Sequence, residues 1–277
     1  MVRREAVAGY FYPSEAGELR SLLGHFREIV ACMAYPDTKD VSGVVSPHAG
    51  YTYSGVTAAC AHYLLSLLPP AETIVLLGPN HRGVGERVAL SGVENWRTPL
   101  GSIPVDTESR EFLLSYAQIF SVDDRAHQFE HSIEVQLPFL QYFLPYSFSI
   151  LPVSLLSQDL VTSKIIGEAL FALAQKKRIL LVASSDFSHY EQEKIARSKD
   201  TGVIERICAL DVEGFFRFIR EERVSVCGPG GIAALMVYHA KRGGKKAELL
   251  NYTTSGEVTG EKHQVVGYAA ISFPLSE

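Results

Sequence analysis

The stretch that most constrains the fold is Thr73 to Gly83, TIVLLGPNHRG, in which four consecutive apolar residues stop at a turn that carries His81. An apolar run without alternation, here Ile74 to Leu77, is typical of a strand buried on both faces in a parallel sheet covered by helices. Ligands of open α/β sheets bind outside the carboxyl ends of the strands. We therefore expect His81 to lie at a functional site.

Two other apolar segments end in the same way: Val41 to Ser46 leads into His48, and Ile179 to Ser184 leads into His189. Segments with helical spacing of apolar residues separate these runs, which is the pattern of βαβ units. We predict one α/β domain spanning residues 1–277, with a central parallel or mixed sheet flanked by helices. In such a sheet His48, His81 and His189 emerge at one edge, together with Asp186.

Two further segments carry specific predictions. Residues 84–105 look like a short β excursion with a hairpin at its WRTPLG turn, which could cover the site as a flap. Residues 127–145 are predicted to form one helix with a kink at Pro138. His131 and Glu134 would share a face of that helix, because residues three apart are neighbours on its surface.

Composition limits the partners. A formal net charge of −5 and an isoelectric point near 6.0 give no reason to expect a nucleic acid or an anionic membrane. No apolar run approaches the roughly 18 residues of a membrane span, and the N-terminus lacks a signal-peptide core. The four cysteines show no paired spacing, which is typical of a reducing compartment. The expected location is therefore cytoplasmic.

Histidines that follow strands suggest a metal site. The imidazoles of His48 and His81 could share an ion, with a third ligand from elsewhere in the chain. Spacing alone does not choose that ligand among Asp186, His189, Glu134, His131 and Cys227. The alternative for each histidine is a turn residue that caps a backbone carbonyl. Cys227 precedes a Gly-rich helix start, where it could be a metal ligand, a reactive thiol or simply a small buried residue.

Six motifs in fixed order carry a family resemblance: PHAGYTYSG, LLGPNH, RTPLG, EHSIEVQLPFL, SSDFSHY and VCGPGG. Together they resemble the Memo family over essentially the whole chain. The resemblance implies a fold similar to the class III extradiol dioxygenases, which use non-haem iron(II). It also implies that His48, His81 and Cys227 bind the metal, and that Asp186 and His189 line the same pocket, with His189 as the acid/base residue.

The family pattern places Cys227 where ring-cleaving dioxygenases have a carboxylate ligand. A thiolate favours softer or redox-active ions, so the expected metal is iron or copper, with zinc as a further candidate.

Three functions follow as hypotheses. The first is a metal-dependent redox or dioxygenase-like enzyme in which Asp186 orients His189 for proton transfer. The second is a non-catalytic module that binds a peptide or a small anion in the same pocket. The third is a zinc hydrolase acting on an unknown small molecule. A serine nucleophile at Ser184 or Ser185 is disfavoured, because the chain lacks the GxSxG turn of such enzymes.

Overall fold

The predicted buried strand is β3 (Thr73–Pro79), and it lies near the middle of the sheet in the computed structural model of this protein. Its parallel neighbours are β9 (Ile179–Ser184) on one side and β8 (Ser149–Leu155) on the other. The next strand, β2 (Val41–Ser46), is parallel to β9. All residues of β2, β3 and β9 are buried. These four strands confirm the parallel centre predicted from their apolar runs.

Strands of mixed direction extend this centre to nine strands in all among the described residues. On the β2 side, β12 (Val265–Pro274) runs antiparallel and itself pairs with β10 (His189–Glu191) and β11 (Glu248–Thr254). On the β8 side, β4 (Val88–Leu90) runs antiparallel and is followed by β7 (Phe120–Val122). The sheet is therefore mixed, as the prediction allowed.

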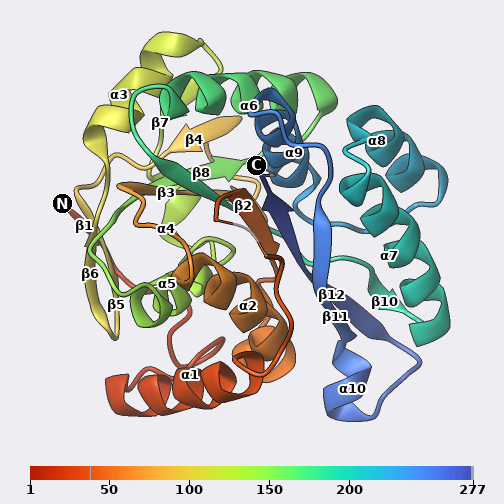
Figure 1. The fold of residues 1–277 in the computed structure, drawn as a ribbon. Coiled ribbons are helices and arrows are strands. Elements are labelled where there is room, and N and C mark those ends of the chain that lie inside the picture. The colour runs from red at the N-terminus through yellow and green to blue at the C-terminus, as the bar shows by residue number, and fades with distance from the viewer. Residues whose placement is uncertain (38, 276–277) are drawn as a thin grey trace.

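Helices cover both faces of the sheet, because alternate residues of β3 face opposite layers. Ile74 and Leu76 belong to one apolar cluster, whereas Val75 and Leu77 belong to the other. The first cluster packs under α1 (Ala16–Val30), α2 (Tyr51–Ser66) and α5 (Leu137–Phe143). The second packs under α3 (Thr107–Tyr116), α6 (Leu160–Ala174), α7 (Glu193–Cys208), α8 (Val212–Glu221) and α9 (Pro229–Lys241). Figure 1 shows these layers, with the short α10 (Ser255–Thr259) beyond β11 and β12.

Residues 84–105 contribute strands to two different sheets. The first of these strands, β4, joins the main sheet. The predicted hairpin consists of β5 (Asn95–Thr98) and β6 (Gly101–Pro104), and β5 also pairs with β1 (Val2–Arg3). The hairpin packs into the core, since Trp96 on β5 is fully buried. These contacts are those of a packed element and not of a mobile flap.

The single kinked helix predicted for residues 127–145 is wrong. The chain instead forms α4 (Arg125–Gln128), a turn of 3-10 helix at Glu134–Gln136, and α5. The physical reason lies at Glu130, whose Oε1 accepts the backbone N–H groups of His131 and Ser132 and so replaces the helical hydrogen bonds there. Pro138 lies in the first turn of α5, where proline is tolerated.

The structure describes residues 1–37 and 39–275. Residues 38, 276 and 277 of the predicted 1–277 domain lie outside this part of the chain. In the described part, no helix has both the length and the apolar character needed to cross a membrane.

Candidate metal centre

Loops at the carboxyl ends of the parallel strands bring two of the predicted histidines together. His48 follows β2 and His81 follows β3, while β9 lies between these strands in the sheet. The two loops reach across the end of β9, so that the imidazole centroids of His48 and His81 are 5.1 Å apart and the rings meet edge to face.

A third imidazole, that of His131, completes the cluster. Its ring centroid lies 5.3 Å from that of His48 and 4.7 Å from that of His81. One ring nitrogen from each of these histidines lies within 4.8 Å of the others. No other group of three or more His, Cys, Asp or Glu residues with this spacing occurs within residues 1–37 and 39–275. Three neighbouring imidazoles are a ligand set that suits zinc, copper or iron.

A glycine allows the loop of His131 to approach β3 closely. A Cβ atom at Gly78 would lie 2.6 Å from both Ser132 Oγ and Ile133 Cγ1, closer than atoms can pack. The hydroxyl of Ser132 then donates to the carbonyl of Pro79 at 2.9 Å. The glycine of the GPNH motif therefore helps to place His131 beside His81.

The ring of His48 is held in one tautomer by Ser184 at the end of β9. The Ser184 hydroxyl donates its only proton to the carbonyl of Ser132 at 2.6 Å. Its oxygen must therefore accept from Gln136 Nε2 and from His48 Nδ1, each at 2.9 Å. Because Nδ1 carries the proton, Nε2 of His48 keeps its lone pair for a metal ion.

Glu130 likewise holds the ring of His81 in one tautomer. One carboxylate oxygen accepts from His81 Nδ1 at 2.9 Å, and the other accepts from the backbone N–H of His81 at 2.7 Å. Burial alone would raise the pKa of Glu130, but the hydrogen bond and charge of His81 and the N–H of Ser132 lower it to about 2. A carboxylate behind a ligating histidine is the usual support of a metal-binding imidazole.

Two histidines of the cluster, His48 and His131, favour the neutral form that binds metals. Burial lowers the pKa of His48 well below its usual value, and the charges of His131, His81 and His189 add to this effect. Burial also lowers the pKa of His131 to about 4. Glu130 opposes this shift, whereas the charges of His81 and Arg82 contribute to it.

Cys227 reaches the cluster through His48. It lies two residues before α9, and its Sγ is 3.1 Å from His48 Nε2. The same sulfur accepts the backbone N–H of Asp186 at 3.0 Å. Burial and the charge of Asp186 raise the pKa of the Cys227 thiol. With Nε2 of His48 unprotonated, a thiol at Cys227 can donate to this nitrogen or to the Asp186 carbonyl, which lies 3.5 Å from the same sulfur.

Asp186 and His189 flank the cluster without contacting each other by a hydrogen bond. Asp186 Oδ1 accepts the backbone N–H of His48 at 2.7 Å, and burial raises the pKa of this carboxyl to about 6. The Nδ1 of His189 donates to the carbonyl of Ser225 at 2.9 Å. The prediction that Asp186 orients His189 is therefore corrected: Ser225 holds this ring.

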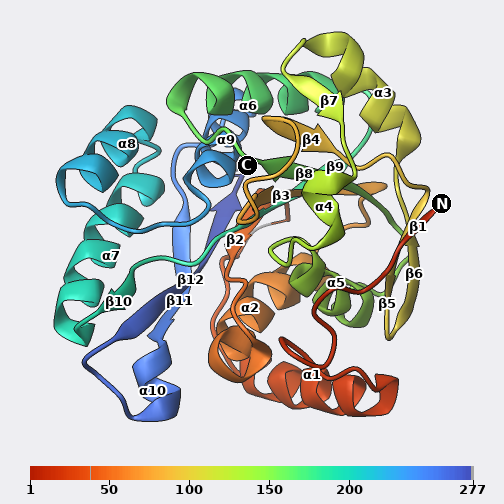
Figure 2. The ribbon, with the colours of Figure 1, turned by 180° about the vertical axis from the view of Figure 1, so that it is seen from behind.

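Glu134 belongs to a different network. Its carboxylate is fully buried and forms an ion pair with Arg3. It also accepts three hydrogen bonds, from the backbone N–H groups of Ala6 at 2.8 Å and Val7 at 3.0 Å and from the hydroxyl of Tyr12 at 2.6 Å. Figure 2 shows this N-terminal segment passing beside α4 and α5 toward α1. Because the helix around residue 131 is broken, Glu134 does not share a face with His131.

Sequence reasoning missed the groups that support the histidines. Glu130 carried one usable signal, since a glutamate directly before His131 lies close to any site that uses this histidine. The sequence suggests only a nucleophilic role for Ser184, and it gives no signal for Ser225. Their contacts are with residues far away in the chain, which a single sequence does not reveal.

Comparisons with known proteins find relatives over nearly the whole chain. A family model described as Memo-like protein matches residues 3–272. A MEMO1 family protein of Methanopyrus kandleri is 45% identical over 280 residues, covering 99% of each chain. One from Nitrosopumilus maritimus is 40% identical over 281 residues, covering 99% of this chain and 100% of the relative. A crystal structure of an uncharacterized Escherichia coli K12 protein matches with a TM-score of 0.56, 16% identity and coverage of 84% of this chain and 100% of that one, a likeness of fold.

Proposed function

The chain belongs to the Memo family, and from this membership and the histidine cluster we propose that it is a metal-dependent redox enzyme with dioxygenase-like chemistry. The observation that carries the proposal is the convergence of three imidazoles whose donor nitrogens lie within 4.8 Å of one another. His48 and His81 supply two ligands. Cys227, whose Sγ lies 3.1 Å from His48 Nε2 but outside the group of three imidazoles, is the proposed third ligand, and His131 is the alternative third ligand.

The donor set fits iron or copper, and zinc in addition. Imidazole nitrogen suits all three ions, and a thiolate favours the softer or redox-active ones. Such an ion supplies Lewis-acid and redox chemistry when bound. Cys227 must release its proton to become a ligand, and this proton loss would also free the lone pair of His48 Nε2 from the thiol.

In this proposal His189 is the residue that moves a proton. Its Nδ1–H is fixed on the Ser225 carbonyl, so Nε2 is the atom that accepts a proton from a substrate and returns it. The buried carboxyl of Asp186, whose pKa burial raises to about 6, is a second group able to exchange a proton near neutral pH. Ser184 and Glu130 keep the ligand rings oriented during turnover.

Metal analysis combined with oxygen uptake tests the proposal. The protein is purified without a metal-binding tag, its metals are measured by elemental analysis, and oxygen consumption is followed with a panel of catechols. We expect near-stoichiometric iron or copper and uptake with at least one catechol. His189→Gln should keep the metal and lose the uptake. Protein that takes up no metal, or consumes no oxygen, would contradict the proposal, and ester hydrolysis by the zinc form without oxygen uptake would favour a hydrolase.

Glu130→Gln is expected to weaken metal binding by about 10- to 100-fold, because the side chain keeps its shape but loses the charge that supports His81. The measurement is competition for the metal with a chromophoric chelator. Glu111→Gln, which changes an exposed glutamate of α3, is the matched control. An unchanged affinity in Glu130→Gln would show that the carboxylate does not support a ligand.

A further inference from the structure

A hollow of about 480 Å³ opens beside the loop that carries His81. Its walls are formed by Arg82, Val84, Arg125, Gln128 and Phe129. A second hollow of about 540 Å³, next to the N-terminal strand, shares Arg125, Gln128 and Phe129. The two hollows therefore meet at these three side chains. Each has the volume of a small-molecule site.

Arg82 is held in place and keeps its charge available. Its Nε donates to the carbonyl of Phe129 at 2.9 Å, and its backbone N–H donates to the side chain of Asn80 at 3.1 Å. The same Asn80 side chain donates to the carbonyl of Val84 at 2.8 Å, which fixes the loop. Within the described residues no carboxylate forms an ion pair with Arg82. Its terminal nitrogens remain for a ligand.

Apolar side chains and a second guanidinium complete the hollow. Phe129 is 60% exposed and Val84 is 48% exposed, although both are large apolar residues. Arg125 is oriented by Asp123, which accepts from its Nε at 2.9 Å and from its terminal nitrogen at 2.7 Å. Asp123 partly balances the charge of Arg125, so Arg82 is the stronger attraction for an anion.

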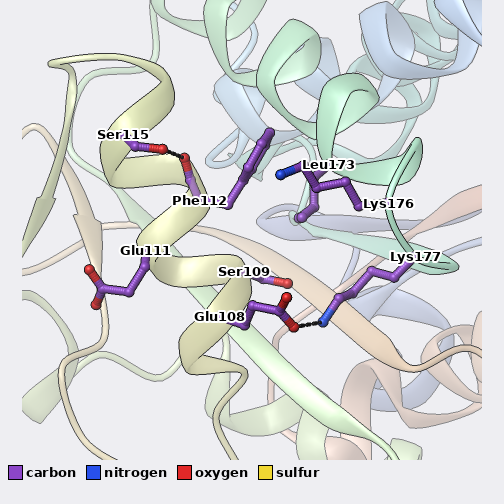
Figure 3. A pocket seen from close by; sticks show the side chains of 8 residues that line it. All are labelled: Glu108, Ser109, Glu111, Phe112, Ser115, Leu173, Lys176 and Lys177. Carbon is purple, nitrogen blue, oxygen red and sulfur yellow. Dashed lines mark hydrogen bonds and ion pairs between the residues drawn. The ribbon is translucent and has the colours of Figure 1, made fainter.

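Another hollow, of about 310 Å³, has as many glutamates as lysines in its lining (Figure 3). It lies between α3 and α6, and its Lys177 forms ion pairs with Glu108 at 3.0 Å and with Asp106 at 3.2 Å. The second cation, Lys176, lies over the ring of Phe112. Glu108 and Glu111 in the same lining balance the charges of the two lysines. Of these two sites, the one beside His81 is therefore better suited to an anionic ligand.

We propose that the hollow beside His81 binds a small organic carboxylate. The planar guanidinium of Arg82 matches a carboxylate in shape and charge, and Phe129 and Val84 cover the apolar body of the molecule. The segment that ends at Phe129 continues into Glu130 and His131, so the bound molecule lies next to the histidine cluster. That the carboxylate is a substrate rests on the proposed function, whereas binding of the carboxylate needs no metal.

Calorimetry on the metal-free full chain tests the proposal with benzoate and its neutral isostere benzamide. We expect benzoate to bind more tightly than benzamide. The affinity for benzoate should fall as the salt concentration increases. Arg82→Gln should lower the benzoate affinity by about tenfold or more, the usual effect of losing a hydrogen-bonded charge. Arg87→Gln is the matched control, since Arg87 is exposed and lies outside this hollow.

Equal binding of benzoate and benzamide, no binding of benzoate, or an unchanged benzoate affinity in Arg82→Gln would overturn the proposal. The metal content of the same variant distinguishes a failure of this binding site from a failure of the proposed function. Arg82→Gln should retain its metal, because Arg82 is not a ligand. If the wild-type protein binds benzoate through Arg82 but holds no metal, the carboxylate site is supported and the proposed redox function is contradicted.

Discussion

The double variant His48→Ala, His81→Ala is expected to lose its bound metal while remaining folded. These residues provide two of the three imidazoles that converge at the site, and removing both leaves too few ligands for a stable centre. The fold should persist because the apolar residues of β2 and β3 pack into the two clusters without the histidines. Elemental analysis and circular dichroism of the same preparation measure the two effects.

A matched control removes two histidines elsewhere. His25 and His263 are exposed and lie outside the cluster, so the variant His25→Ala, His263→Ala should keep its metal. Retention of stoichiometric metal in the His48, His81 variant would show that the ion binds at another place.

Glu134→Ala is expected to destabilise the protein by about 3–5 kcal/mol, the usual cost of removing one partner of a buried ion pair. The substitution leaves the guanidinium of Arg3, which is only 5% exposed, without its carboxylate. It also leaves the hydroxyl of Tyr12 and the N–H groups of Ala6 and Val7 without an acceptor. Thermal unfolding of the metal-free protein measures the effect as a drop of roughly 10 °C in Tm.

Glu94→Ala is the control for this experiment. Glu94 pairs with the N-terminal amino group, but its side chain is 75% exposed. Exposed ion pairs contribute little to stability, so this variant should unfold close to the wild-type temperature. A Tm of Glu134→Ala that matches the control would mean that Glu134 does not anchor the N-terminal segment.

The sheet and its loops were predictable because their signals are local. The apolar runs of β2, β3 and β9 and the turns that follow them are read directly from neighbouring residues. Parallel strands then bring His48 and His81 to one edge by geometry alone. The order of the strands was not predictable, since the pairing of β9 between β2 and β3 depends on contacts across more than 100 residues.

The broken helix shows why the environment of the site was harder to predict. The residues from 127 to 145 have helical spacing, but the carboxylate of Glu130 takes the N–H groups that a continuous helix would use. That carboxylate is held there by His81, 49 residues earlier. The competing interaction is therefore tertiary. It separates His131, which joins the cluster, from Glu134, which anchors Arg3.

X-ray absorption spectroscopy of the metal-loaded wild-type protein tests the central claim most directly. For the zinc form we predict the multiple scattering of at least two imidazole rings, from His48 and His81, together with a sulfur atom at about 2.3 Å from Cys227. Three imidazoles without sulfur would place His131 in the position of Cys227. A spectrum with oxygen ligands and no imidazole would contradict a metal centre built on these histidines.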